Sequence, residues 1–150
     1  MYGDTEIIRR RVAALRDQGA DISTLADQLV ARIERLGWSG RAADAMRERV
    51  GERATHLRAA AARHTSAADA LAAHAEAVDE TAEQITSTEH RVTRLVDDAK
   101  ARIAQISARN EFGDGLRVDP DPLDETLAAF TPPPHGHRDW LDVELPGLDR

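Results

Sequence analysis

Histidines and carboxylates are the residue types in this chain that could hold a metal ion or move a proton. Glu52 lies four residues before His56, so the two side chains could share one face of a helix. A metal site needs about three convergent protein ligands, and one such pair supplies too few of them. The spacing therefore predicts an exposed pair on a helix surface and no metal centre.

The other polar groups give no stronger sign of catalysis. Asp79, Glu80 and Glu83 have the spacing of a solvated helix face, and His135 and His137 flank a glycine in a segment predicted to be irregular. The chain has no cysteine, so it has no thiolate ligand and no cysteine nucleophile. It also lacks a nucleophile elbow and a phosphate-binding loop. We expect no enzymatic activity, no metal and no cofactor.

Charge and composition narrow the class of protein. The 150 residues carry a net charge of −7, with 27 acids against 20 bases, and the bases form no clustered face of the kind that binds nucleic acid. Aromatic residues make up 3%, which favours long alanine-rich helices over a thick core. No apolar run approaches the ~20 residues of a membrane span. The first residues lack the basic and apolar blocks of a secretory signal peptide.

A short stretch, Leu-Gly-Trp-Ser-Gly-Arg-Ala at residues 36–42, divides two amphipathic patterns. Glycine is the usual residue where a helix stops in a left-handed conformation, and Ser39 has the side chain of a helix N-cap. The expected local structure is helix, tight turn, helix. Trp38 is predicted to cap the end of the two-helix core, to help form a groove that a partner protein recognises, or to do both.

Both flanking patterns have the seven-residue period of a coiled-coil seam, over residues 5–36 and 40–110. The first seam consists of Ile8, Val12, Leu15, Gly19, Ile22, Ala26, Leu29, Ile33 and Leu36. The second has a mostly large row (Val50, Leu57, His64, Leu71, Val78, Ile85, Val92, Ala99, Ile106) and a row that begins with alanines (Ala54, Ala61, Ala68, Ala75, Ala82, Glu89, Val96, Ile103). An alanine row lets two helices approach closely, and the period predicts a left-handed supercoil.

The second helix is predicted to be much longer than the first, roughly 100 Å against roughly 45 Å. The apolar seam over residues 75–110 would then be exposed unless something covers it. Either the helix bends back on itself or a partner binds there. Residues 66–69 and 86–88 are the two candidate breaks, although the seven-residue phase runs through both and favours one helix. His64 and Glu89 are polar seam residues, which in coiled coils can fix register or partner choice.

Residues 111–150 form an acidic, proline-containing tail that we expect to be flexible. Residues 123–130 fit a short helix started by Asp121 or Pro122. Near the end, acids alternate with apolar residues, so the tail is either disordered or a peptide that docks on a partner or on the uncovered helix. The docking candidates are Trp140, Leu141, Val143 and Leu145.

The arrangement of a helix, a Trp-x-Gly turn and an alanine-rich helix resembles the WXG100 or ESAT-6-like family of type VII secretion substrates. Residues 36–40, followed by Ala42, Ala43 and Met46, carry this resemblance, which covers residues ~5 to ~90. It implies an all-α fold: an antiparallel helical hairpin at residues 1–110, with an extended second helix and a largely irregular tail. It also implies pairing into a four-helix bundle, with Trp38 and Gly40 shaping the turn and the partner groove.

For function, the resemblance implies a type VII secretion substrate or secretion-associated adaptor. Such a protein acts as a homodimer, or as a heterodimer with a WXG100-like protein, and the secretion ATPase is a further candidate partner. Export would need no signal peptide, and the chain would be cytoplasmic before export. The family's Tyr-x-x-x-Asp/Glu signal is missing after the second helix, because the only tyrosine is Tyr2. This departure favours a partner that supplies the signal, or the alternative of a cytosolic coiled-coil scaffold or chaperone that is not exported.

Overall fold

The computed structural model describes residues 5–113 and 115–148, which leaves Tyr2 outside the described part. Its elements are three α-helices, α1 (Thr5–Arg35), α2 (Arg41–Phe112) and α3 (Pro122–Ala128), and a 3₁₀ helix, η1 (Arg138–Asp142). The described residues contain no strand, so the predicted all-α class, with a long second helix and a largely irregular tail, is confirmed. They fall into two compact units, residues 5–78 and residues 79–148.

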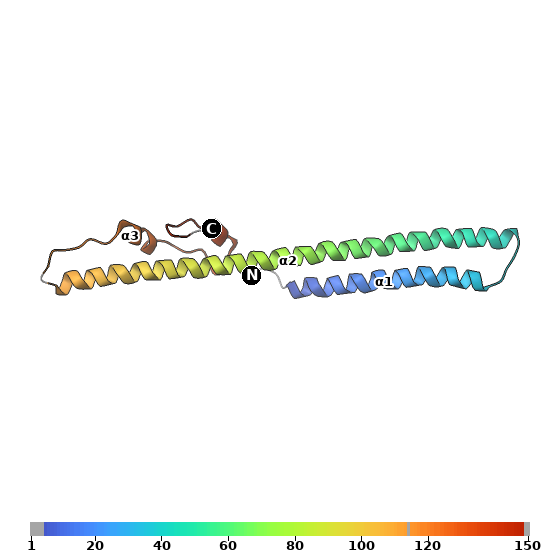
Figure 1. Cartoon of the computed structure of the whole chain (residues 1–150), viewed down its shortest axis with the longest axis horizontal. Helices are drawn as coiled ribbons and strands as arrows, with labels where there is room; N and C mark the ends of the chain where they lie inside the picture. Colours follow the sequence, from blue (N-terminus) through green and yellow to red (C-terminus); the bar gives the residue numbers. More distant parts are fainter. Residues whose placement is uncertain (1–4, 114, 149–150) are drawn as a thin grey trace. The chain divides into compact units, whose positions relative to one another are not determined.

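In the first unit, α1 runs antiparallel to the first part of α2 (Figure 1). The alanine row predicted from the sequence forms the contact: Ala54, Ala61, Ala68 and Ala75 are buried. They face the small members of the α1 seam, of which Val12, Gly19 and Ala26 are buried. Small side chains on both helices allow a close approach, so dispersion contacts are made between backbones as well as side chains.

Gly19 shows how close the two helices come. A methyl group added at Gly19 would lie 3.2 Å from the carbonyl oxygen of Ala61 and 3.3 Å from Cβ of His64. A glycine inside a helix costs roughly 0.5–1 kcal/mol relative to alanine. At this position the missing side chain is what lets the facing helix approach.

Two ion pairs mark the register of the hairpin. Arg16 Nη2 lies 3.0 Å from Asp69 Oδ1, and Arg58 Nη2 lies 2.7 Å from Asp27 Oδ1. Asp27 follows Arg16 by the same number of residues as Asp69 follows Arg58, so both pairs belong to one antiparallel register. Both are solvent-exposed, and such pairs contribute about 0–1 kcal/mol each. The ion pairs therefore agree with the register set by the buried small residues and add little to the stability of the hairpin.

Helix α2 is continuous through both candidate breaks, as the seven-residue phase favoured. Thr86, in the second candidate break, donates its hydroxyl hydrogen bond to the carbonyl oxygen of Ala82 at 2.9 Å, and Thr65 donates likewise to Ala61 at 3.3 Å. Hydroxyl bonds of this kind, back to the carbonyl four residues earlier, weaken a helix only slightly. The main-chain hydrogen bonds of α2 therefore continue through both threonines. No helix in the described part of the chain is long and apolar enough to cross a membrane.

In the second unit, residues 115–148, here called the strap, lie along the part of α2 that begins at Asp79 (Figure 1). Helix α3 starts as predicted, because Asp121 accepts a hydrogen bond from the N–H of Leu123 at 2.8 Å and Pro122 fills the first turn. The core of this unit contains Ile85, Val92 and Val96 of α2 and Trp140 of the strap. The strap therefore covers the seam in the second half of α2.

Candidate protein-interaction site

The turn between α1 and α2 depends on two glycines. Gly37 has φ of 62° and Gly40 has φ of 100°, values that residues with a side chain adopt rarely. The first hydrogen bond of α2 runs from the N–H of Asp44 to the carbonyl oxygen of Gly40, at 3.1 Å. Gly40, rather than the expected Ser39, therefore occupies the N-cap position.

Arg47 fixes the backbone of this turn from the first turns of α2. Its guanidinium donates one hydrogen bond to the carbonyl oxygen of Trp38 and another to Asp44 Oδ1 at 2.8 Å. Asp44 is also the acidic residue in the first turn of α2, where a negative charge is favoured by the helix dipole. The Trp38 main chain is thus held in place, while its side chain makes separate contacts.

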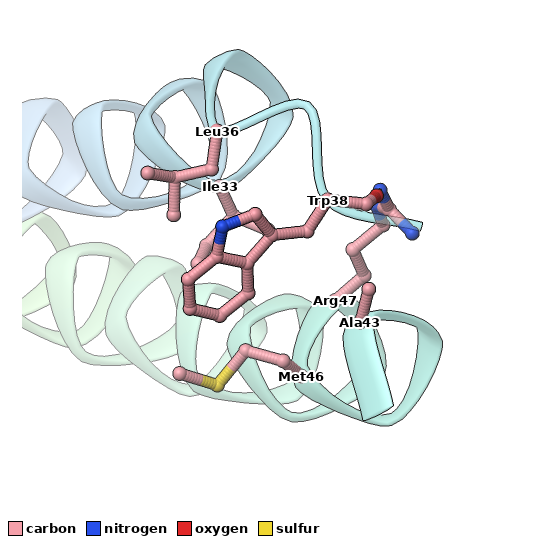
Figure 2. A pocket seen from close by; sticks show the side chains of 6 residues that line it. All are labelled: Ile33, Leu36, Trp38, Ala43, Met46 and Arg47. Atoms are coloured by element: carbon pink, nitrogen blue, oxygen red, sulfur yellow. The ribbon is translucent and has the colours of Figure 1, made fainter. Parts of the chain in front are cut away.

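The indole of Trp38 lies over the end of the two-helix core, at the turn. Figure 2 shows it between Leu36, at the end of α1, and Met46, in α2, with Ile33 behind. Trp38 is nevertheless 58% exposed, and Leu36 and Met46 are also exposed. The side chain therefore touches the end of the core without sealing it, and it leaves an apolar patch at the turn. Exposed apolar patches that include tryptophan are typical of protein-binding surfaces.

A second apolar surface extends along the hairpin beside the alanine contact. The large seam residues occupy equivalent heptad positions on two antiparallel helices, so they lie on the same face. All are only half-buried: Ile8, Leu15, Ile22 and Leu29 on α1, and Val50, Leu57, His64, Leu71 and Val78 on α2. We call this surface the large-residue face. The hairpin buries its small residues internally and leaves its large ones partly open.

The predicted docking residues of the tail all lie in or against one apolar cluster. Trp140 is 2% exposed and packs with Ile85, Val92 and Val96, while the side chains of Leu141, Val143 and Leu145 are partly buried against them. The indole N–H of Trp140 donates to the carbonyl oxygen of Pro134 at 2.9 Å. The structure brings these four residues together within the unit of residues 79–148, and Trp38 belongs to the other unit.

A bidentate ion pair anchors α3 of the strap. Arg102 Nε donates to Asp124 Oδ2 at 2.9 Å, and Arg102 Nη2 donates to Oδ1 at 2.6 Å. These hydrogen bonds lower the pKa of Asp124, against the opposing effect of its burial, and they raise the pKa of Arg102. Two parallel bonds from a planar fork fix orientation as well as distance.

Glu89, the polar residue of the predicted seam, anchors a different part of the strap. Its Oε1 lies 2.8 Å from Nδ1 of His135, and its Oε2 accepts from the N–H of Gly136 at 3.3 Å. The hydrogen bond from His135 is the main cause of a lowered pKa for Glu89. The carboxylate thus holds both a side chain and a main-chain group of the strap.

The structure adds functional candidates that sequence reasoning missed, namely Arg47, Arg102, Asn110 and Asp124. Asn110 pairs with both main-chain groups of Val118: its Nδ2 donates at 2.7 Å and its Oδ1 accepts at 2.9 Å. In the sequence, the one sign of this role is that Asn110 continues the seam row of Val96 and Ile103 at the seven-residue period. Within residues 5–113 and 115–148, no three metal-ligating side chains are grouped, and His56 is exposed.

Comparison with known families finds a match over most of the chain. Residues 1–114 match a family described as "Putative T7SS secretion signal domain", where T7SS denotes the type VII secretion system. No curated protein and no solved structure matches the chain. The matched stretch contains the whole hairpin, the turn at Trp38 and all of α2, and it ends where the strap begins.

Proposed function

Since this chain belongs to the family of T7SS secretion signal domains, we propose that it is a type VII secretion substrate that pairs with a like helical protein before export. The pairing partner would be a second helical hairpin of the WXG100 or ESAT-6-like kind, in another copy of this chain or in a related protein. The family supports export by a route that uses no signal peptide. The proposed pairing rests on the surface of the hairpin.

The observation that carries the pairing is the difference between the two seam rows. Alanines and Gly19 already fill the contact between α1 and α2, while the large-residue face remains half-open in the single chain. Burying apolar surface contributes about 25 cal/mol per Å², so this face is the one that gains most from a partner. A second hairpin stacked on it would form a four-helix bundle with the large residues at its centre.

Replacement of one large-face residue tests the pairing. Leu71→Gln should weaken dimerisation by about 10- to 100-fold, since a buried leucine contributes about 1.5–3 kcal/mol. Ala73→Gln is the matched control, because Ala73 is exposed on the same helix two residues away. The measurement is sedimentation equilibrium, alone and with candidate hairpin proteins. Equal dimerisation of the two variants would contradict pairing through this face.

Trp38 is proposed to act at the turn, beside the partner. Because its indole is mostly exposed and adds little to the hairpin core, Trp38→Ala should leave the helicity largely intact while reducing export. Phe112→Ala is the control, since Phe112 is an exposed aromatic residue at the end of α2. The readout is the ratio of chain in culture filtrate to chain in cells. Unchanged export of the Trp38 variant would remove this role.

A further inference from the structure

The two halves of α2 carry the same heptad period but different surfaces. Along the first half, four alanines lie against another helix. Along the second half, the seam holds Ile85, Val92 and Val96, and the residues that bury it come from the irregular strap. A seam of this pattern ordinarily pairs with a helix. The polar residues of the seam indicate why an irregular segment lies there instead.

Two polar seam residues bind main-chain groups of the strap. Glu89 accepts a hydrogen bond from the N–H of Gly136. Asn110 donates to the carbonyl oxygen of Val118 and accepts from its N–H. In a packed helix these main-chain groups are already used by the helical ladder and are unable to reach a neighbour. Glu89 and Asn110 therefore favour a segment whose backbone is free over a helix, which can pair with the apolar seam residues but not with these two.

Specific contacts, rather than overall charge, hold the strap. Residues 115–148 contain seven acids and two bases, and residues 79–112 of α2 contain seven acids and five bases. Both sides are net negative, so their general electrostatic interaction is repulsive. Docking depends on the Arg102–Asp124 pair, the two polar seam residues and the burial of Trp140. Reversing the charge of Arg102 would turn its ion pair with Asp124 into a repulsion that adds to this general one, so it should release the strap.

We propose that residues 85–110 of α2 form a docking surface for a non-helical peptide segment, that the strap occupies it in cis, and that this occupation keeps the seam from pairing with a second copy of the chain. A released strap would uncover Ile85, Val92, Val96 and Ala99, with Ile103 and Ile106 continuing the same rows. These residues have coiled-coil spacing, so a second α2 is the occupant expected on the uncovered surface. The proposal goes beyond the proposed function and does not depend on export.

The test uses the full chain with Trp38→Phe as background, so that Trp140 is the only tryptophan. Arg102→Asp removes the bidentate pair and places two carboxylates together. In this variant, the fluorescence of Trp140 should shift towards that of a solvated indole. Self-association, measured by sedimentation equilibrium, should become about tenfold or more tighter than in the background. Arg109→Asp makes the same charge change at an exposed position of α2 and should alter neither reading. All these variants keep the same hairpin, so any pairing through it contributes equally to each measurement and does not affect the comparison.

A charge swap separates release of the strap from misfolding. Arg102→Asp combined with Asp124→Arg restores the opposite charges, so it should return both the Trp140 emission and the self-association to the background values. Amide hydrogen exchange should place the extra association of the single variant on residues 85–106. The proposal is overturned if the emission of Arg102→Asp stays unchanged, or if it shifts without any association beyond that of Arg109→Asp.

Discussion

At the scale of single residues, two glycines inside helices have opposite roles. Gly19 faces α2 so closely that a methyl group there would meet the Ala61 carbonyl oxygen and Cβ of His64. Gly51 lies in α2 with nothing within 4 Å of the position a methyl group would take. The same residue type therefore permits helix contact at one position and only weakens the helix at the other.

This difference predicts opposite effects of one substitution. Gly51→Ala should raise the free energy of unfolding by about 0.5–1 kcal/mol, because alanine favours the helix and meets no obstacle. Gly19→Ala should lower it, since the new methyl group pushes against backbone that has little room to move. Chemical denaturation followed by circular dichroism measures both. A similar rise in both variants would show that the helices are not closely packed at Gly19.

His64 is a second seam residue that lowers the stability of the hairpin. Its Nδ1 is buried and has no hydrogen-bond partner in the described part of the chain. Such an atom costs about 1–3 kcal/mol, so His64→Leu should stabilise the chain by about 1 kcal/mol or more. His56→Leu is the control, because His56 is exposed and should change stability by less than about 0.5 kcal/mol. Thermal unfolding that ranks the control above His64→Leu would contradict this.

At the scale of elements, the strap and the second half of α2 are held through ionised carboxylates. Hydrogen bonds lower the pKa of Asp124 and of Glu89, so the docked state binds fewer protons than the released state near these pKa values. Their contribution is therefore fully present above the ordinary carboxyl pKa of about 4 and is lost as the pH falls through the lowered values. Docking of the strap should weaken on acidification.

Trp140 fluorescence in the Trp38→Phe background measures this dependence. As the pH falls from 7 to below the ordinary carboxyl pKa of about 4, emission should shift towards that of a solvated indole once Asp124 and Glu89 become protonated. Asp124→Asn already lacks one of the two carboxylates, so its shift with pH should be smaller and its strap more weakly docked at pH 7. An emission maximum that does not move in the original background would show that these carboxylates do not hold the strap.

At the scale of the whole molecule, the heptad rows were enough to predict the hairpin, the uninterrupted α2 and the buried alanines. Asp121 and Pro122 were enough to predict the start of α3. The anchors of the strap were not predictable, because Arg102 and Asp124 are 22 residues apart and Glu89 and His135 are 46 apart. No periodic pattern links residues at such separations across an irregular segment. Trp140 was a candidate because of its type, but its contacts depend on how the strap folds.

Export of this helical chain by a type VII secretion system is the central prediction. The most direct test measures the chain in the culture filtrate of its native host, with the type VII ATPase present and with it deleted, using a cytosolic protein as the lysis control. We expect the chain to be released only when the ATPase is present. Retention in the cytosol of both strains would contradict export and favour an internal scaffold or chaperone built on the same hairpin.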